Sequence, residues 1–274
     1  MKKILLLSVC LFVCWALFAQ QRIKVACVGN SITYGTGLAD RATQSYPVQL
    51  QKLLGEHYEV ENFGKPGATL LNQGHRPYTR QEEYRKALDF AGDIVVIHLG
   101  INDTDPRDWP NYRDSFVTDY LNLMDTFRKA NPDVRIIIAR MTPIADRHNR
   151  FLSGTRDWHG EMQTAIETVA HYAGVQLIDF REPLYPYPFL LPDAVHPTAE
   201  GAAIMAKTVY SAITGDYGGL KLSPLYMDNM VLQRDTPLLI HGTANAGEQV
   251  TVRIDHQQWI TKAALDGKWS VKLS

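Results

Sequence analysis

The chain contains few cysteines, and this scarcity limits the chemistry that it can support. Only three of its 274 residues are cysteine, and two of them, Cys10 and Cys14, fall in an apolar N-terminal stretch. Loss of that stretch would leave Cys27 alone, which excludes an intrachain disulfide and a zinc site built on thiolates. Because Cys27 lies in an apolar run, we expect a small buried hydrophobic residue rather than a reactive thiol.

An excess of charge is also missing. The formal net charge is -1, which provides no electrostatic attraction for nucleic acid. His148, His159 and His171 lack the spacing that is typical of metal ligands. We therefore expect no nucleic-acid partner, no metal and no cofactor. The length is ample for one α/β domain together with a smaller unit.

A signal peptide is predicted at the N-terminus. Two lysines precede the apolar run Ile4–Phe18, and Ala19 offers a small residue for cleavage before Gln20. The run is too short and ends too abruptly for a good membrane span, whereas it is typical of a secretory signal. We therefore predict a signal over residues 1–19, a secreted or periplasmic protein, and no integral membrane span after cleavage.

Short apolar strands alternate with helical segments between residues 22 and 213. The first strand is nearly continuously apolar, as expected for a strand covered on both faces of a parallel sheet. Pro197 is predicted to occupy the first position of the last helix, and the glycine-rich segment 34–44 is predicted to be a loop. The alternation predicts an α/β fold with helices on both faces of a parallel sheet. The predicted strands are 23–28, 58–63, 93–99, 134–139 and 175–180, and the predicted helices are 46–54, 80–90, 112–130, 156–173 and 197–213.

The pattern changes to short alternating runs after residue 213. Glycines in the segment 215–221 indicate a linker, and the runs beyond it indicate an all-β unit over residues 222–274. This unit is an incomplete sandwich, because a seven-stranded sandwich needs about 100 residues. Since Ser274 ends on a predicted strand, we expect the natural protein to continue past it. The predicted strands are 230–233, 238–242, 249–254 and 269–273.

Ser31 stands where the first predicted strand is broken by Gly29 and Asn30. A serine on a sharp turn after a buried strand is a recurring place for a nucleophile, because the turn lifts the hydroxyl off the sheet. This place lies outside the carboxyl end of the strand, where open α/β sheets bind ligands. The alternative is that Ser31 only caps the next helix.

Further polar residues follow other strands or precede the last helix, and together they suit acyl transfer. A serine needs a base to take its proton, and His196 is the side chain best suited to that near neutrality. Asp193, three residues earlier, can hold the imidazole in one tautomer. The side chain of Asn102 and a bare N–H of Gly67 can stabilise an oxyanion.

Each of these residues also has an ordinary structural role open to it. Gly67 could be a turn glycine, and Asn102 could form an Asx turn. His196 could cap the last helix, and Asp193 could accept hydrogen bonds from loop amides. The combined order and contexts favour the catalytic interpretation, because one reaction requires all of them.

Four sequence blocks resemble those of the SGNH (GDSL-type) hydrolases over about residues 22–213. The resemblance implies a hydrolase domain over residues 20–214 with a flavodoxin-like, three-layer α/β/α fold and five parallel strands. It also implies Ser31 as nucleophile, His196 as base and Asp193 as its orienting partner, with an oxyanion hole formed by the Ser31 N–H, the Gly67 N–H and the Asn102 side chain. Asn30 departs from the family, whose name expects aspartate there. The blocks are Gly29-Asn-Ser-Ile-Thr33, Asn62-x-Gly64-x-x-Gly67, Gly100-Ile-Asn-Asp103 and Asp193-x-x-His196-Pro197.

The C-terminal segment resembles a different family. Residues 222–234, 242–248 and 266–269 are similar to the opening β-domain of sialate O-acetylesterases. That family's own catalytic domain would lie beyond Ser274, so the resemblance implies no site residue here. It does imply a polypeptide that acts on carbohydrate.

The sequence therefore predicts a secreted serine esterase that removes acyl groups, most simply acetyl groups, from carbohydrate. Its expected substrate is an acetylated carbohydrate or another small ester. Trp109, Trp158 and Tyr187 could stack on sugar rings near the mouth of the site, although packing is an alternative role for each. His98 is expected to be a core histidine. Two other functions stay open: a lysophospholipase or acyl-thioesterase of the same family, and a non-catalytic glycan-binding module.

Overall fold

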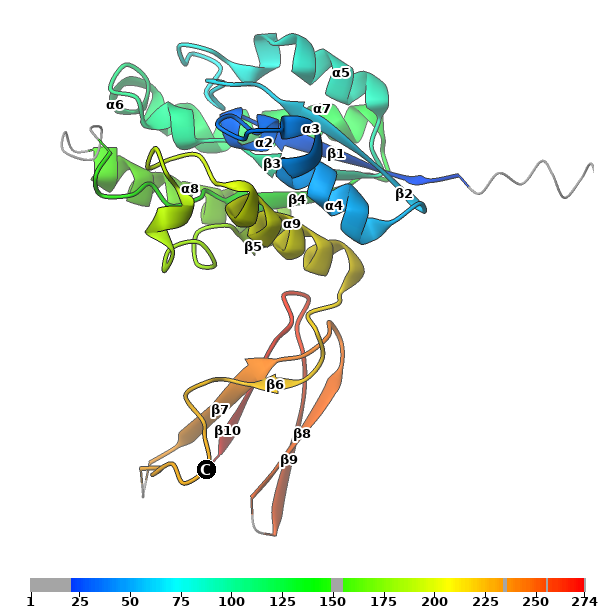
Figure 1. The fold of residues 1–274 in the computed structure, drawn as a ribbon, viewed down its shortest axis with the longest axis vertical. Coiled ribbons are helices and arrows are strands. Elements are labelled where there is room, and N and C mark those ends of the chain that lie inside the picture. The colour runs from blue at the N-terminus through cyan, green and yellow to red at the C-terminus, as the bar shows by residue number, and fades with distance from the viewer. Residues whose placement is uncertain (1–20, 149–154, 234–235, 255, 274) are drawn as a thin grey trace, which may run out of the picture.

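A computed structural model describes residues 21–148, 155–233, 236–254 and 256–273 (Figure 1). The predicted signal over residues 1–19 lies outside the described residues. The chain forms an α/β region with a parallel sheet. After the last helix of that region, a single connecting segment leads into a region of antiparallel strands. Within the described part of the chain, no helix combines the length and the apolar character needed to cross a bilayer.

The α/β region is built on a five-stranded sheet in which every neighbouring pair of strands is parallel, in the order β2-β1-β3-β4-β5. This arrangement confirms the predicted fold. The side chains of residues 25–28 in the central strand are fully buried, as the apolar run requires. They include Cys27, so the expectation of a small buried residue is confirmed, and burial raises the pKa of its thiol to about 12. The strands are β1 (Ile23–Gly29), β2 (Tyr58–Gly64), β3 (Ile94–His98), β4 (Arg135–Arg140) and β5 (Gln176–Asp179).

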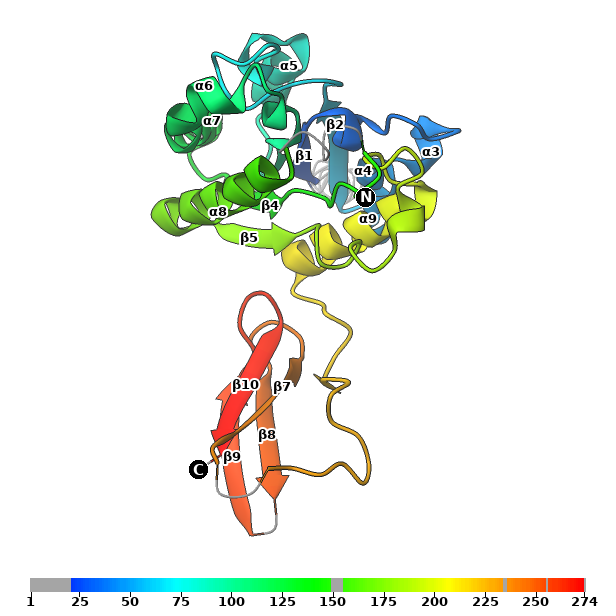
Figure 2. The same cartoon turned by 90° about the vertical axis from the view of Figure 1, so that its left-hand side faces the viewer.

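Helices cover both faces of this sheet (Figure 2). On one face α4 (Tyr46–Leu54) packs against α9 (Ala199–Thr214). On the other, α7 (Phe116–Ala130) lies between α5 (Glu82–Phe90) and α8 (Thr155–Ala173). The buried side of α7 follows the helical period and meets the core. Shorter helices fill the connections: α2 (Ser31–Tyr34), α3 (Arg41–Gln44), α6 (Trp109–Tyr112), and the 3-10 turns η1 (Tyr78–Arg80), η2 (Ile101–Thr104), η3 (Arg113–Ser115) and η5 (Pro188–Leu190).

Several predicted boundaries were wrong by a few residues. Pro197 precedes α9 instead of opening it, because Thr198 is the N-cap and its side chain accepts the N–H of Gly201. The segment 34–44 is not wholly a loop, since Asp40 caps the short helix α3 through the N–H of Ala42. The helix predicted to begin at residue 112 begins as α7 at Phe116, after two short turns.

The C-terminal region forms two small antiparallel sheets, one in the order β10-β7-β6 and the other the hairpin β8-β9. The predicted strand at residues 230–233 was wrong: its described residues carry no strand, and Val231 is 96% exposed. Two strands, β6 and β9, were not predicted. The resemblance of this region to sialate O-acetylesterases stays a prediction. The strands are β6 (Lys221–Leu222), β7 (Leu238–Thr243), β8 (Gln249–Ile254), β9 (Gln257–Lys262) and β10 (Lys268–Leu273).

Candidate active site

Ser31 is the first residue of α2, directly after the turn that ends β1. Asn30, not Ser31, is the N-cap, and its side-chain oxygen accepts the N–H of Ile32 at 2.9 Å. The turn is crowded, because a Cβ atom at Gly29 would lie 2.0 Å from the Thr33 hydroxyl oxygen and 2.9 Å from the carbonyl oxygen of His98. The departure at Asn30 therefore preserves a capping side chain and leaves the Ser31 hydroxyl free for another partner.

The imidazole of His196 is that partner. Its Nε2 lies 2.8 Å from Ser31 Oγ, and its Nδ1 lies 2.6 Å from Asp193 Oδ2. The carboxylate can only accept a hydrogen bond, so Nδ1 carries the proton and Nε2 accepts the serine hydroxyl. The structure thus brings Ser31, which lies 165 residues before His196 in the sequence, together with His196 and Asp193.

A tight turn fixes the relation between Asp193 and His196. Asp193 Oδ1 accepts the backbone N–H groups of Val195 at 3.0 Å and His196 at 2.7 Å, while Ala194 between them has a φ of 75°. Partial burial raises the pKa of Asp193, but these amides and the His196 ring outweigh it, so the pKa is lowered. Asp193 therefore stays ionised while it orients the imidazole.

The predicted oxyanion donors lie on two neighbouring loops. Gly67 has a φ of 76°, a conformation that favours glycine, and the next residue, Ala68, accepts a hydrogen bond from Asn102 Nδ2 at 2.9 Å. The N–H of Lys65 donates to Gly29 at 2.9 Å, which ties this loop to the end of β1. Among the described residues, no acceptor takes the backbone N–H of Ser31 or that of Gly67.

Asp103 has a supporting role that the sequence analysis did not assign. Its carboxylate is fully buried and accepts the backbone N–H groups of Leu70 at 2.8 Å and Leu71 at 2.7 Å. Burial raises the pKa of Asp103 to about 7 even though both amides lower it. These bonds join η2, which carries Asn102, to the loop after Gly67. The sequence feature that could have indicated this role is the position of Asp103 next to Asn102 in the third sequence block.

A small cavity of about 180 Å³ opens beside the Ser31–His196 pair. Known sites for drug-sized ligands have volumes of roughly 300–1,000 Å³, so this cavity suits a small group. Gly67 does not line it, although Asn102 does. The lining residues are Ser31, Ile101, Asn102, Thr104, Ile144, His148, Val195 and His196.

The three aromatic residues predicted to contact sugar do not line this cavity. The prediction for Trp109 was wrong: its side chain is only 3% exposed, its indole N–H donates to Glu161, and its ring packs edge-on against Phe116. Trp158 is half-buried and packs against the core. Tyr187 is exposed and lies 5.9 Å, between ring centroids, from Phe189.

His98 is confirmed as a core residue. Its ring is fully buried, its Nε2 accepts the Thr142 N–H at 3.4 Å, and burial lowers its pKa to about 3. The ring is therefore neutral and takes no part in the Ser31–His196 pair.

Across the described ranges, no group of three or more His, Cys, Asp or Glu side chains is placed to hold a metal ion.

Known proteins share sequence with this chain over most of its α/β region. The profile of the GDSL-like lipase/acylhydrolase family matches residues 27–204. An acetylxylan esterase of Xylanibacter ruminicola is 33% identical over 215 residues, which are 71% of this chain but only 44% of that relative. The chain thus spans less than half the length of that relative.

Solved structures share the fold at lower identity. The acetyl xylan esterase AlAXEase is 22% identical, with a TM-score of 0.55 over 70% of this chain and 100% of that chain. A carbohydrate acetylesterase family member from Sinorhizobium meliloti is 21% identical, with a TM-score of 0.55 over 69% of this chain and 96% of that chain. At this level of identity the likeness establishes the α/β architecture alone.

Proposed function

Because the chain belongs to the GDSL-like lipase/acylhydrolase family, we propose that it is a serine ester hydrolase that removes acetyl groups from carbohydrate. The observation that carries the proposal is the hydrogen-bonded series from Asp193 through His196 to Ser31, with heavy-atom distances of 2.6 and 2.8 Å. Both distances lie within the range at which protons transfer between side chains.

In the proposed reaction, Ser31 Oγ attacks the carbonyl carbon of the ester while His196 Nε2 takes the hydroxyl proton. The negative charge that develops on the carbonyl oxygen is stabilised by the N–H groups of Ser31 and Gly67 and by the Asn102 amide. His196 then gives its proton to the departing sugar hydroxyl, which leaves acetyl-Ser31. Water repeats the sequence, and acetate is released. Asp193 stabilises the imidazolium throughout.

The size of the cavity supports the acetyl group. A volume of about 180 Å³ beside Ser31 accommodates a two-carbon acyl group more readily than the long chain of a lysophospholipid or an acyl-thioester. The relative from Xylanibacter ruminicola supports the carbohydrate class. The predicted signal at residues 1–19 supports action outside the cytoplasm, and we propose residues 20–214 as the hydrolase domain followed by a separate β-domain.

Hydrolysis of p-nitrophenyl acetate tests the proposal. We expect turnover by the wild type and its loss, by about 10⁴-fold or more, in Ser31→Ala. Ser270→Ala, which removes an exposed hydroxyl in β10, is the matched control and should keep wild-type turnover. Equal rates in wild type and Ser31→Ala would instead support a glycan-binding module.

A series of acyl lengths tests the acetyl preference. We expect p-nitrophenyl acetate to be cleaved faster than the octanoyl ester, because the cavity beside Ser31 is too small for the longer acyl chain. Faster cleavage of octanoyl and longer esters would favour the lysophospholipase or thioesterase function. Acetylated xylan, sialic acid and pectin, compared under the same conditions, would then identify the carbohydrate.

A further inference from the structure

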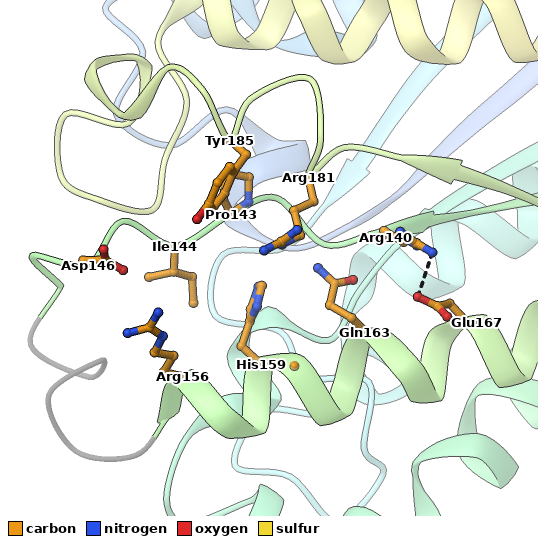
Figure 3. A pocket seen from close by; sticks show the side chains of 11 residues that line it. Arg140, Pro143, Ile144, Asp146, Arg156, His159, Gln163, Glu167, Arg181 and Tyr185 are labelled. Carbon is orange, nitrogen blue, oxygen red and sulfur yellow. Dashed lines mark ion pairs between the residues drawn. The ribbon is translucent and has the colours of Figure 1, made fainter. Parts of the chain in front are cut away.

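A second cavity lies on the other side of Ile144 from the Ser31 cavity. Its volume is about 280 Å³, and Ile144 lines both cavities. Three arginines from different elements reach it: Arg140 ends β4, Arg156 belongs to α8, and Arg181 follows β5 (Figure 3). Three cationic side chains therefore line a cavity that shares the Ile144 side chain with the cavity beside Ser31.

Only one of the three arginines is neutralised. Arg140 pairs with Glu167 at 2.7 Å and with Asp179 at 3.1 Å. Within the part of the chain that the structure describes, Arg156 and Arg181 form no ion pair. The lining carries three arginines and two acids, Glu167 and Asp146, so the lining residues have one excess positive charge. Asp179, the second partner of Arg140, lies outside the lining.

The floor of the cavity is polar but already bonded, and it adds no charge. Gln163 uses both ends of its amide on the backbone of Met141, at 3.0 and 2.9 Å. His159 bonds to the carbonyl of Thr142 at 3.1 Å, and burial, assisted by the positive charge of Arg181, lowers its pKa to about 4. The guanidinium groups of Arg156 and Arg181 therefore remain as the charged groups available to a ligand.

The wall between the cavities is fixed to the proposed catalytic turn. Ala145, next to Ile144, donates its N–H to the carbonyl of Ala194 at 2.9 Å, between Asp193 and His196. A ligand that places an ester in the first cavity and extends past Ile144 would reach the second. A glycan has this form, since one sugar carries the acetyl ester and its neighbour extends beyond it.

We propose that the second cavity binds the carboxylate of a uronic acid unit adjacent to the acetylated sugar, through Arg156 and Arg181. Guanidinium groups suit carboxylates because their planar N–H donors match two carboxylate oxygens. Arg181 also lies 4.8 Å from the centroid of the Tyr185 ring, which is 62% exposed and offers an apolar face to a sugar. The inference rests on the proposed function and narrows its substrate to acidic acetylated glycans.

A matched pair of substrates tests this inference. The pair consists of an acetylated oligosaccharide that carries one uronic acid, and the same compound with that acid as its neutral methyl ester. For the wild type we expect kcat/KM for acetate release to be about 10-fold higher with the free acid, mainly through KM, as for a charge-assisted hydrogen bond at a partly exposed site. The double variant Arg156→Gln/Arg181→Gln should reduce that ratio to about one.

Controls separate the possible failures. Arg85→Gln removes an exposed arginine on α5 and should keep the wild-type ratio. Circular dichroism checks that the double variant is folded, and the single variant Arg156→Gln, at an exposed position, should show a smaller loss of the ratio. Equal rates with acid and methyl ester in the wild type, or an unchanged ratio in a folded double variant, would overturn the inference alone. Failure of the wild type to release acetate from either compound or to cleave p-nitrophenyl acetate would overturn the proposed function.

Discussion

The α/β region and the C-terminal β-region bury different kinds of side chain. The α/β region places polar groups in its interior beside the apolar core, among them Asn30, His98 and Asp103. In the β-region, the buried cluster among the described residues contains seven side chains, all apolar or aromatic: Ile240, Ala244, Val250, Ala263, Trp269, Val271 and Leu273.

The difference shows where this chain can support chemistry. Parallel strands end at a common edge, and loops that leave that edge hold polar groups against one another with backbone amides around them. The strands of the β-region are antiparallel, and the long connection between β6 and β7 carries large exposed apolar side chains such as Val231 and Leu225. Among the residues of the β-region that the structure describes, none lines the cavity beside Ser31. We therefore assign catalysis wholly to the α/β region.

Among the variants that test this comparison between the regions, Asp193→Asn should have the largest effect. Asn Oδ1 can still accept the N–H groups of Val195 and His196, but Nδ2 would then donate to His196 Nδ1. That bond would put the imidazole proton on Nε2, which could no longer accept the Ser31 proton. We expect kcat for p-nitrophenyl acetate to fall by about 10³- to 10⁴-fold without loss of the fold. Near-normal kcat in the variant would show that the carboxylate does not orient the base.

Asn102→Ala should have a smaller effect. It removes one oxyanion donor, so we expect kcat to fall by about 10²- to 10³-fold with little change in KM. Asn111→Ala is the matched control, because it removes an amide that donates to the carbonyl of Arg107 and does not line the cavity beside Ser31. A rise in KM at constant kcat would place Asn102 in ground-state binding instead.

His98→Gln should alter how stability depends on pH. Because burial lowers the folded-state pKa of His98 from 6.5 to about 3, the unfolded chain binds more protons between these values, and stability is lost as the pH falls through this window. Between neutral pH and about pH 4, the free energy of unfolding of the wild type should fall by about 3 kcal/mol more than that of the variant. Asp103, whose folded-state pKa is raised, contributes in the opposite direction in both proteins, and so it cancels from the difference.

Urea unfolding of both proteins at a series of pH values measures this difference. Parallel curves for wild type and variant would contradict a neutral buried His98. The result would sharpen the comparison between the regions, because the titrating group belongs to the polar interior of the α/β region.

Removal of the β-region should have the smallest effect on turnover. A chain that ends at residue 216 keeps every residue that lines the cavity beside Ser31. It loses the hydrogen bonds from Ala246 to Gly215 and from Gln176 to Leu265. We expect kcat for p-nitrophenyl acetate to stay within about two-fold and stability to fall by about 1–2 kcal/mol. Loss of turnover in a folded truncated chain would break the assignment of catalysis to the α/β region.

The sequence predicted the α/β region better than the β-region, and the reason is physical. The buried run at the first strand and the polar residues after it are local patterns, and the rules for parallel sheets bring their ends together without further information. The run at residues 230–233 is apolar but finds no partner strand. The strand β9 (Gln257–Lys262) was missed because its sequence is largely polar, and it forms because β8 pairs with it.

The parts of the site that sequence reasoning missed depend on tertiary contacts. Asp103 is identified only when its carboxylate is seen to accept two amides from another loop. Trp109 was predicted to face sugar because aromatic residues near a loop can do so, but Glu161 on α8 satisfies its N–H and Phe116 covers its ring. Arg156 and Arg181 are 25 residues apart, and nothing in their local sequence indicates that they share a cavity.

The most direct test of the central claim is covalent trapping of the nucleophile. The wild type would be treated with a fluorophosphonate, which reacts with serines activated by a neighbouring base, and the adduct would be located by peptide mass spectrometry. We predict one adduct per chain, on Ser31, and strongly slowed labelling in His196→Ala. An adduct on a different serine, or active enzyme that is neither labelled nor inhibited, would contradict the account.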